Sequence, residues 1–431
     1  MDSTAVFKEG QLKFRHNDYF GAIDDFNRVI KLDPKNPSAF CNRALAEGRL
    51  HLCDVAILDY SRAIQLNPGD DLAYSGRGIA NFEKGYSDLA VNDFSRAIKL
   101  NENNVQAFVC RGIAEYHQTN LAAASDDFLQ TLRLDPNDAS ANRYLGWICY
   151  RQTNYVAATG YFNRFIRLKP KLSDGYSGRA AVEEKSKDWT GAIADLDQAI
   201  DLTRTDPDLY YRRGSLKYDN QDWDGAISDY RKVIELGNKW CSAYDILGLA
   251  LWKRGDLDGA ISNESESIKI NPTNYWPYLN RSAVEVDQGK LDEAINDLSR
   301  AIELDATNSI AYNNRAWAKF LKNDFDSAIA DATKAIELNT TNGRALGTRG
   351  WARFGKGDRD GAKTDCQRAI SFFKPDSVEF DYDQGLVVFM NGDYEKAVAC
   401  WEDALKKEPW RKYQLKPWIE KAKAKLSGNR L

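Results

Sequence analysis

The side chains that most often do chemistry are few in this sequence and lie far apart. The three histidines are His16, His51 and His117, and none stands in a His–Glu metal motif. Gly76 and Gly78 lack the third glycine of a dinucleotide fingerprint, and neither a phosphate loop nor a nucleophile elbow is present. We therefore expect no catalytic, metal-binding or cofactor-binding site, and no small-molecule substrate.

The seven cysteines form no pattern of their own. Their number is odd and no two lie two or three residues apart, which argues against a disulfide framework and against a zinc site. Reduced cysteines that pack as small apolar side chains are typical of cytoplasmic proteins. The sequence therefore predicts a cytoplasmic location.

A third group of reactive side chains is a series of arginines at multiples of 34 residues, which could contact the phosphates of a nucleic acid. An aspartate follows each of them by sixteen residues. The pairs are Arg43 with Asp59, Arg77 with Asp93, Arg111 with Asp127, Arg179 with Asp195, Arg213 with Asp229, Arg281 with Asp297, Arg315 with Asp331 and Arg349 with Asp365. Where Leu145, Leu247 or Gln384 replaces the arginine, the aspartate is absent as well. Repeat one is the exception, with Glu9 and Asp25. We therefore predict Arg–carboxylate ion pairs with two parallel hydrogen bonds, not phosphate binding.

The elements that hold these residues follow a repeat. An alanine recurs every 34 residues from Ala22 to Ala362, and a twelfth stands 35 residues later at Ala397. Twelve residues before each alanine is a glycine, alanine or serine, which indicates a close crossing of two helices. Apolar residues recur at three- and four-residue steps, which is the helical period. Each unit is therefore predicted to form helix A, a short turn and helix B.

Within a unit, a small residue at position 8, Ala at 20, an aromatic residue at 24, Ala at 27 and Pro at 32 resemble the tetratricopeptide repeat signature. The resemblance covers nearly the whole chain. It implies an all-α fold, an α-solenoid that is a right-handed superhelix of antiparallel helix pairs. It also implies that the chain binds a protein, without saying which one.

The predicted organisation is one continuous solenoid followed by a capping segment. The twelve units span 3–36, 37–70, 71–104, 105–138, 139–172, 173–206, 207–240, 241–274, 275–308, 309–342, 343–376 and 378–411. In the basic segment 412–431, Pro417 suits the first turn of a helix, and the apolar residues after it fall on one stripe. We expect this helix to cover the open face of the last repeat.

Charge and hydropathy narrow the possible partners. The net charge is −4, and the segment 404–431 carries +7, so the remaining residues carry −11. An acidic body argues against a groove that binds nucleic acid. No stretch approaches the length of an apolar membrane span, and the first ten residues lack a secretory signal pattern.

Repeat eight departs from the pattern. Its position 24 is Glu264 and its position 27 is Ser267, where the other repeats favour apolar residues. A buried carboxylate is costly without a partner, so we expect Glu264 to have one or to reach water. Two interpretations stay open for Asn263, Glu264 and Ser267: local tolerance within a long array, or a functional role as a hinge or a polar contact site.

The resemblance also implies where a partner would bind, because helix A lines the concave surface in this family through positions 2, 5, 6, 9, 12 and 13. These positions carry many aromatic residues, Arg and Asn, which is the composition of an interaction hot spot. The candidate peptide-binding residues are Asn42, Tyr116, Arg143, Trp147, Tyr150, Tyr211, Arg212, Tyr218, Trp252, Trp276, Asn280, Asn313, Asn314, Trp317, Phe320, Trp351 and Phe354. Packing against the neighbouring helix is the alternative for position 12.

The sequence therefore favours a non-catalytic protein-interaction scaffold that binds an extended peptide or partner segment in its concave groove. One alternative is a scaffold that self-associates, and the oligomeric state stays open. Another is binding of an anionic partner through the basic C-terminal helix.

Overall fold

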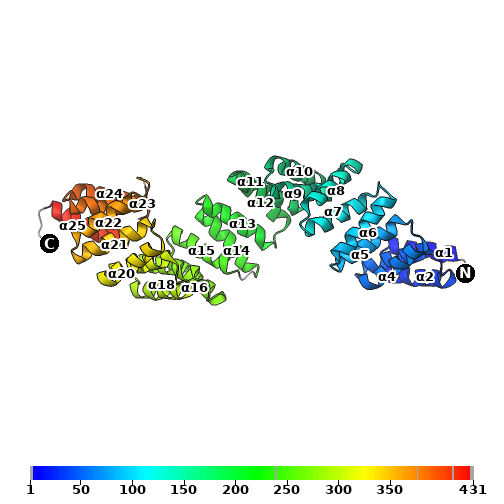
Figure 1. The fold of residues 1–431 in the computed structure, drawn as a ribbon, viewed down its shortest axis with the longest axis horizontal. Helices are drawn as coiled ribbons and strands as arrows, with labels where there is room; N and C mark the ends of the chain where they lie inside the picture. Colours follow the sequence, from blue (N-terminus) through cyan, green and yellow to red (C-terminus); the bar gives the residue numbers. More distant parts are fainter. Residues whose placement is uncertain (1–2, 238–239, 376, 410–411, 428–431) are drawn as a thin grey trace. The chain divides into compact units, whose positions relative to one another are not determined.

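The computed structural model describes residues 3–237, 240–375, 377–409 and 412–427, and within these ranges it contains twenty-five α-helices and no strand (Figure 1). The chain divides into two compact units, residues 1–204 and 205–431, which are described separately. In each unit the helices form successive pairs, and each pair packs on the next along the chain. Both units are α-solenoids, so the predicted fold class is confirmed. Continuity of the solenoid from one unit to the other stays a prediction.

The N-terminal unit holds six helix pairs. They are α1 (Ser3–Arg15), α2 (Tyr19–Leu32), α3 (Pro37–Arg49), α4 (Cys53–Leu66), α5 (Asp71–Glu83), α6 (Ser87–Leu100), α7 (Val105–His117), α8 (Leu121–Leu134), α9 (Ala139–Arg151), α10 (Tyr155–Leu168), α11 (Ser173–Lys185) and α12 (Trp189–Leu202).

The C-terminal unit holds six more pairs and a final single helix. They are α13 (Pro207–Asp219), α14 (Trp223–Glu235), α15 (Cys241–Arg254), α16 (Leu257–Ile270), α17 (Trp276–Asp287), α18 (Leu291–Leu304), α19 (Ser309–Leu321), α20 (Phe325–Leu338), α21 (Gly343–Lys356), α22 (Arg359–Ile370), α23 (Val378–Met390), α24 (Tyr394–Lys407) and α25 (Lys412–Leu426). None of the described helices combines the length and the apolar character that a membrane crossing requires.

The turn inside each pair has the same backbone conformation. Position 15 of every repeat has a left-handed φ, between 59° and 95°, and glycine occupies it in five of the twelve repeats. In most repeats an Asp or Asn follows and caps helix B. Asp188, for example, accepts a hydrogen bond from the Gly191 backbone N–H at 3.0 Å. The turn reverses the chain within a few residues and sets helix B against helix A.

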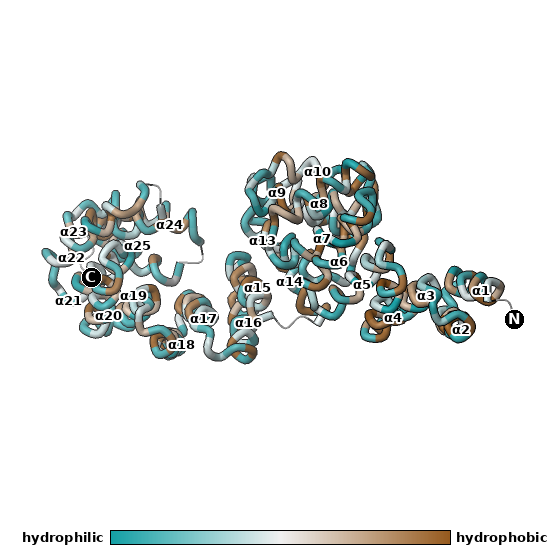
Figure 2. Tube along the Cα trace, turned by 45° about the vertical axis from the view of Figure 1, so that its right-hand side comes forward, coloured by the Kyte–Doolittle hydropathy of each residue, from teal (hydrophilic) through white to brown (hydrophobic). Residues whose placement is uncertain are grey.

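The helices of a pair cross at the small residue of position 8. A Cβ atom added to Gly78 would lie 2.7 Å from the Phe94 ring, and one added to Gly385 would lie 2.2 Å from the Trp401 ring. The alanine at position 20 is fully buried in all twelve repeats. Apolar and polar segments alternate along the helices (Figure 2), as amphipathic packing requires. The close crossing predicted from the series of small residues is confirmed.

We expect Gly385→Ala to destabilise the C-terminal unit by about 1–3 kcal/mol, because the new methyl overlaps the buried Trp401 ring. Gly214→Ala is the matched control. A Cβ atom added there would lie 3.2 Å from the nearest atom, and alanine favours a helix. Urea unfolding followed by circular dichroism measures both variants. Equal stability of the two would show that the crossing distance does not restrict position 8.

The predicted Arg–Asp pairs are present in all eight repeats. In each pair Nε and Nη2 of the arginine donate to the two carboxylate oxygens at 2.5–2.9 Å. The bidentate geometry aligns helix A with helix B within each repeat. In repeat one, which has no such arginine, Lys13 donates to Asp25 at 2.6 Å instead.

The sequence pattern did not reveal a third contact of these arginines. In seven of them Nη1 donates to position 25 of the preceding repeat at 2.5–3.4 Å. The acceptors are Asn27, Ser61, Ser95, Asn163, Ser265, Ser299 and Thr333. Each of these arginines therefore joins two successive repeats.

The expected hydrogen-bond partner of Glu264 is not found among the described residues, and its access to water stays a prediction. Its side chain occupies position 24, where several other repeats have an aromatic ring, and it is 1% exposed. Neither of its carboxylate oxygens has a hydrogen-bond partner among the described residues. Burial and the nearby Asp245 raise the pKa of Glu264 to about 10, against opposing contributions from Asn280 and Arg281. The carboxyl group is therefore protonated at neutral pH, which avoids the cost of a buried charge. Whether repeat eight is a hinge stays a prediction.

The final helix α25 differs from its prediction at one end. It begins at Lys412, so Pro417 lies inside the helix and not in its first turn. Because Pro417 has no N–H, α25 lacks the backbone hydrogen bond that this residue would otherwise donate to the carbonyl four residues before it. Leu415, Ile419 and Ala422 are buried where α25 packs on the last repeat, and the capping role of this helix stays a prediction.

Candidate functional site

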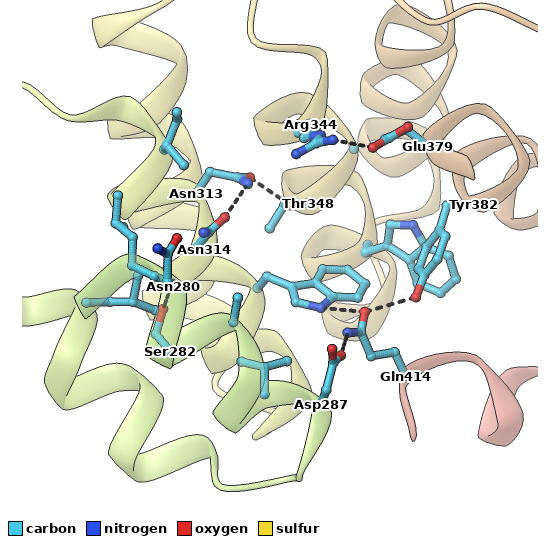
Figure 3. Close-up of a pocket in the computed structure, with 18 of the residues that line it drawn as sticks. Asn280, Ser282, Asp287, Asn313, Asn314, Arg344, Thr348, Glu379, Tyr382 and Gln414 are labelled. Atoms are coloured by element: carbon cyan, nitrogen blue, oxygen red, sulfur yellow. Dashed lines mark hydrogen bonds and ion pairs between the residues drawn. The ribbon is translucent and has the colours of Figure 1, made fainter. Parts of the chain in front are cut away.

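The helix α25 also contacts α17, three repeats before the last one. Together with α15, α19, α21 and α23 these helices line a groove of about 320 Å³ (Figure 3). We call this hollow the repeat 9–12 groove. It lies at the small end of the range of ligand pockets, about 300–1,000 Å³.

Seven of the candidate residues named from the sequence line the repeat 9–12 groove. They are Trp252, Trp276, Asn280, Asn313, Asn314, Trp317 and Trp351. Trp276 is half exposed, and the neighbouring Ile310 is exposed to a similar extent. Asn280 and Asn314 are half-buried. These four side chains give the groove an accessible surface of mixed apolar and amide character.

Three candidate residues are buried more deeply than a peptide-binding role would require. Trp351 is 1% exposed, Phe320 is 4% exposed and Asn313 is 7% exposed. The Trp351 ring packs against Trp418 of α25, with 5.1 Å between the ring centroids. The alternative interpretation for position 12, packing against the neighbouring helix, therefore describes Phe320. Trp351, at position 9, is a core residue that α25 covers. Phe354 lies outside the groove lining and packs on the Trp418 and Phe389 rings.

The other candidates in the C-terminal unit also lie outside the groove lining. Tyr211 packs edge-on against Tyr230, and Tyr218 packs against Trp223. Arg212 is half-buried beside Tyr211. Their role in binding stays a prediction.

The candidates in the N-terminal unit form a separate aromatic cluster on α7 and α9. Tyr116 packs on Tyr144 at 5.1 Å, and Arg143 lies 4.9 Å above the Tyr144 ring while it pairs with Asp174. The Trp147 ring packs against Phe162 and against Tyr150. Asn42, on α3, donates to the Ser38 carbonyl. The five candidate side chains here are half-buried, and their role in binding stays a prediction.

Gln414 of α25 connects the walls of the repeat 9–12 groove. Its Oε1 accepts hydrogen bonds from Trp317 Nε1 at 3.1 Å and from the Tyr382 hydroxyl at 2.9 Å. Its Nε2 donates to Asp287 at 2.9 Å, and the other Asp287 oxygen accepts from Trp252 Nε1. One buried amide thus ties α25 to α17, α19 and α23 (Figure 3). Sequence reasoning missed Gln414, because the segment 412–431 has no repeat register.

A row of polar side chains runs along one wall of the groove. Position 6 of four successive repeats holds Asn280, Asn314, Thr348 and Asp383, and all four line the groove. The Thr348 hydroxyl donates to Asn313, which in turn donates to Asn314 (Figure 3). Thr348 and Asp383 share the register of the asparagines, so that signal could have identified them from the sequence.

The charged lining of the groove is mainly acidic. Arg344 and Glu379, both at position 2, form an ion pair with each other. Asp383 is 4% exposed and accepts a hydrogen bond from Trp351 Nε1 at 3.1 Å. Burial raises the pKa of Asp383 to about 8, although the bond from Trp351 opposes that rise. Both acids stand at positions that the sequence analysis assigned to the concave surface, but neither was among its candidate residues.

Stacked two-helix repeats with a groove on their first helices define an α-solenoid repeat protein. A tetratricopeptide repeat model matches residues 7–71, 111–173, 211–275 and 348–411, and two further models of this repeat match residues 283–322 and 310–342. The chain belongs to the tetratricopeptide repeat family. Members of this family are generally protein-interaction scaffolds.

Solved structures of other repeat proteins are similar over most of the chain. The yeast Tom70 structure is 16% identical, with 91% of this chain and 95% of that chain covered and a TM-score of 0.39. The Cut9–Hcn1 hetero-tetramer of the APC/C is 12% identical, with 98% and 96% covered and a TM-score of 0.47. A repeat protein from Parabacteroides merdae is 20% identical, with 58% and 98% covered and a TM-score of 0.44. Among curated proteins, no sequence matches this chain.

Proposed function

We propose that this chain is a non-catalytic, cytoplasmic scaffold that binds an extended segment of a partner protein in the repeat 9–12 groove. The observation that carries the proposal is the row of polar side chains at position 6, flanked by the exposed Trp276 and Ile310. An extended backbone has unpaired N–H and C=O groups, and the amide groups of Asn280 and Asn314 can both donate to it and accept from it. The apolar rings beside them supply the burial that drives binding.

Peptide display on the full chain tests this proposal. We expect a random peptide library to yield sequences that bind the wild type at least tenfold more tightly than the double variant Trp276→Ala/Asn314→Ala. Both side chains are accessible, so their loss should leave the fold intact, which circular dichroism checks. Lys334→Ala on α20 is the control, because that exposed lysine is outside the groove lining. Peptides that bind the double variant as tightly as the wild type would place the binding site elsewhere.

A further inference from the structure

The groove contains a carboxyl group whose hydrogen-bonding capacity is only partly used. Asp383 Oδ1 accepts from Trp351, whereas Oδ2 accepts no hydrogen bond from any described residue. No described lysine, arginine or histidine forms an ion pair with Asp383. The side chain lines the groove although it is 4% exposed, so Oδ2 is an unused acceptor at the inner end of a hollow.

The residue that faces this oxygen is a glycine, which has no side chain. Gly347 stands opposite Asp383, and a Cβ atom added to it would lie 2.3 Å from Oδ2. Gly347 lines the same groove. A larger residue there would displace the carboxyl group, so glycine leaves it room at the groove surface.

The aromatic rings that line the groove favour a cation. Trp252, Trp276 and Trp317 line the groove together with Tyr382 and Trp351. The faces of aromatic rings attract ammonium groups, and tryptophan does so most strongly. Arg344 is the one basic residue in the lining, and it already pairs with Glu379. An anionic ligand would therefore meet buried acids without a matching cation.

We propose, building on the function above, that the repeat 9–12 groove recognises a lysine side chain of the bound segment, whose ammonium group pairs with Asp383 Oδ2. An ammonium is a compact point charge and needs one acceptor oxygen, whereas an arginine binds a carboxylate best through both oxygens. Trp351 already occupies Oδ1, so the site suits lysine. The apolar stem of lysine packs along the tryptophan rings, while its charged end reaches the carboxylate.

The proposed contact with lysine should also make the binding affinity depend on pH. The free carboxyl group has a pKa of about 8, and pairing with an ammonium requires the ionised form. Binding of lysine therefore releases a proton below pH 8, so affinity should rise as pH increases from 6 to 8 and then level off. The lysine itself stays charged in this range, because its usual pKa is about 10.4.

Calorimetry with blocked pentapeptides tests the inference on the full chain. The probes are Ac-Ala-Ala-Lys-Ala-Ala-NH2 and the same peptide with norleucine, arginine or glutamate in place of lysine. We expect the lysine peptide to bind at least tenfold more tightly than the norleucine peptide at pH 8, and this preference to shrink at pH 6. Asp383→Asn should abolish the preference, because the amide can still accept from Trp351 but carries no charge.

Asp381→Asn is the matched control, since it removes one acid from the same helix that is outside the groove lining and pairs with Lys407. It should leave the preference for lysine unchanged. Equal binding of the lysine and norleucine peptides, or tightest binding of the glutamate peptide, would overturn the lysine site while leaving the groove function intact. Absence of binding by all four probes, together with failure of the display experiment, would overturn both.

Discussion

Replacement of Glu264 by glutamine is expected to stabilise the C-terminal unit by about 3 kcal/mol at pH 8 and to have almost no effect at pH 4.5. Each unit of pKa shift corresponds to about 1.4 kcal/mol. The pKa of Glu264 rises from its usual 4.5 to about 10 on folding. Between these values the folded chain holds one more proton than the unfolded chain, so the stability that depends on this group falls as pH increases through that window.

The full pKa shift of Glu264 would predict a larger increase in the free energy of unfolding. The glutamine amide, however, also lacks hydrogen-bond partners in this buried position, and this reduces the expected increase. Glu264→Leu tests the same cost with an apolar side chain of similar size. Four other carboxyl groups titrate in the same pH range, because burial raises the pKa of Glu47, Glu115, Glu183 and Glu285 to about 7. The informative quantity is therefore the difference between variant and wild type at each pH.

Urea unfolding at pH 4.5 and pH 8 provides the measurement. Glu266→Gln is the control, because this half-exposed residue of the same helix pairs with Lys269 and should change stability little at either pH. A Glu264→Gln protein that is less stable than the wild type at pH 8 would show that the carboxyl group is a satisfied structural element.

Shortening two buried side chains of α25 is the second change with a large expected effect. Leu415 is fully buried and Ile419 is 7% exposed, and both pack in the core that contains Trp351 and Trp401. Leu415→Ala and Ile419→Ala should each cost about 2–5 kcal/mol, because each removes buried methyl groups and leaves a cavity. The double variant should release α25 and expose the tryptophans beneath it.

Differential scanning calorimetry measures this loss, and binding of a hydrophobic dye reports exposure of the underlying surface. Lys416→Ala is the control, since this exposed side chain on the same helix contacts only Glu420. Unchanged melting of the double variant, without dye binding, would show that α25 is not needed to cover the last repeat.

The repeat register predicted local structure well because each helix pair packs mainly against the pairs beside it in the sequence. The alanine spacing predicted the helix pairs, the small residues predicted their crossings, and the joint replacement of Arg and Asp predicted their ion pairs. Each of these relations involves residues at fixed separations, so it repeats and becomes visible in one sequence. The third contact of the arginines was missed, because position 25 varies among Asn, Ser and Thr.

The candidate site was predictable only in part. Its asparagines and tryptophans follow the register, whereas Gln414 reaches Asp287 across 127 residues and belongs to no repeat. The burial of Trp351 under Trp418 depends on the same non-repeating helix. Glu264 is a different case: the sequence located the exception, but only packing shows that both oxygens remain unpaired.

The arginine that joins each repeat to its predecessor is absent in repeats five, eight and twelve, where Leu145, Leu247 and Gln384 stand. Cooperativity in a repeat array depends on the coupling between nearest neighbours. Local opening should therefore begin between α8 and α9, between α14 and α15, or between α22 and α23. Fluctuations should therefore concentrate at the three repeat boundaries that lack the guanidinium group, while the boundaries that have it stay closed.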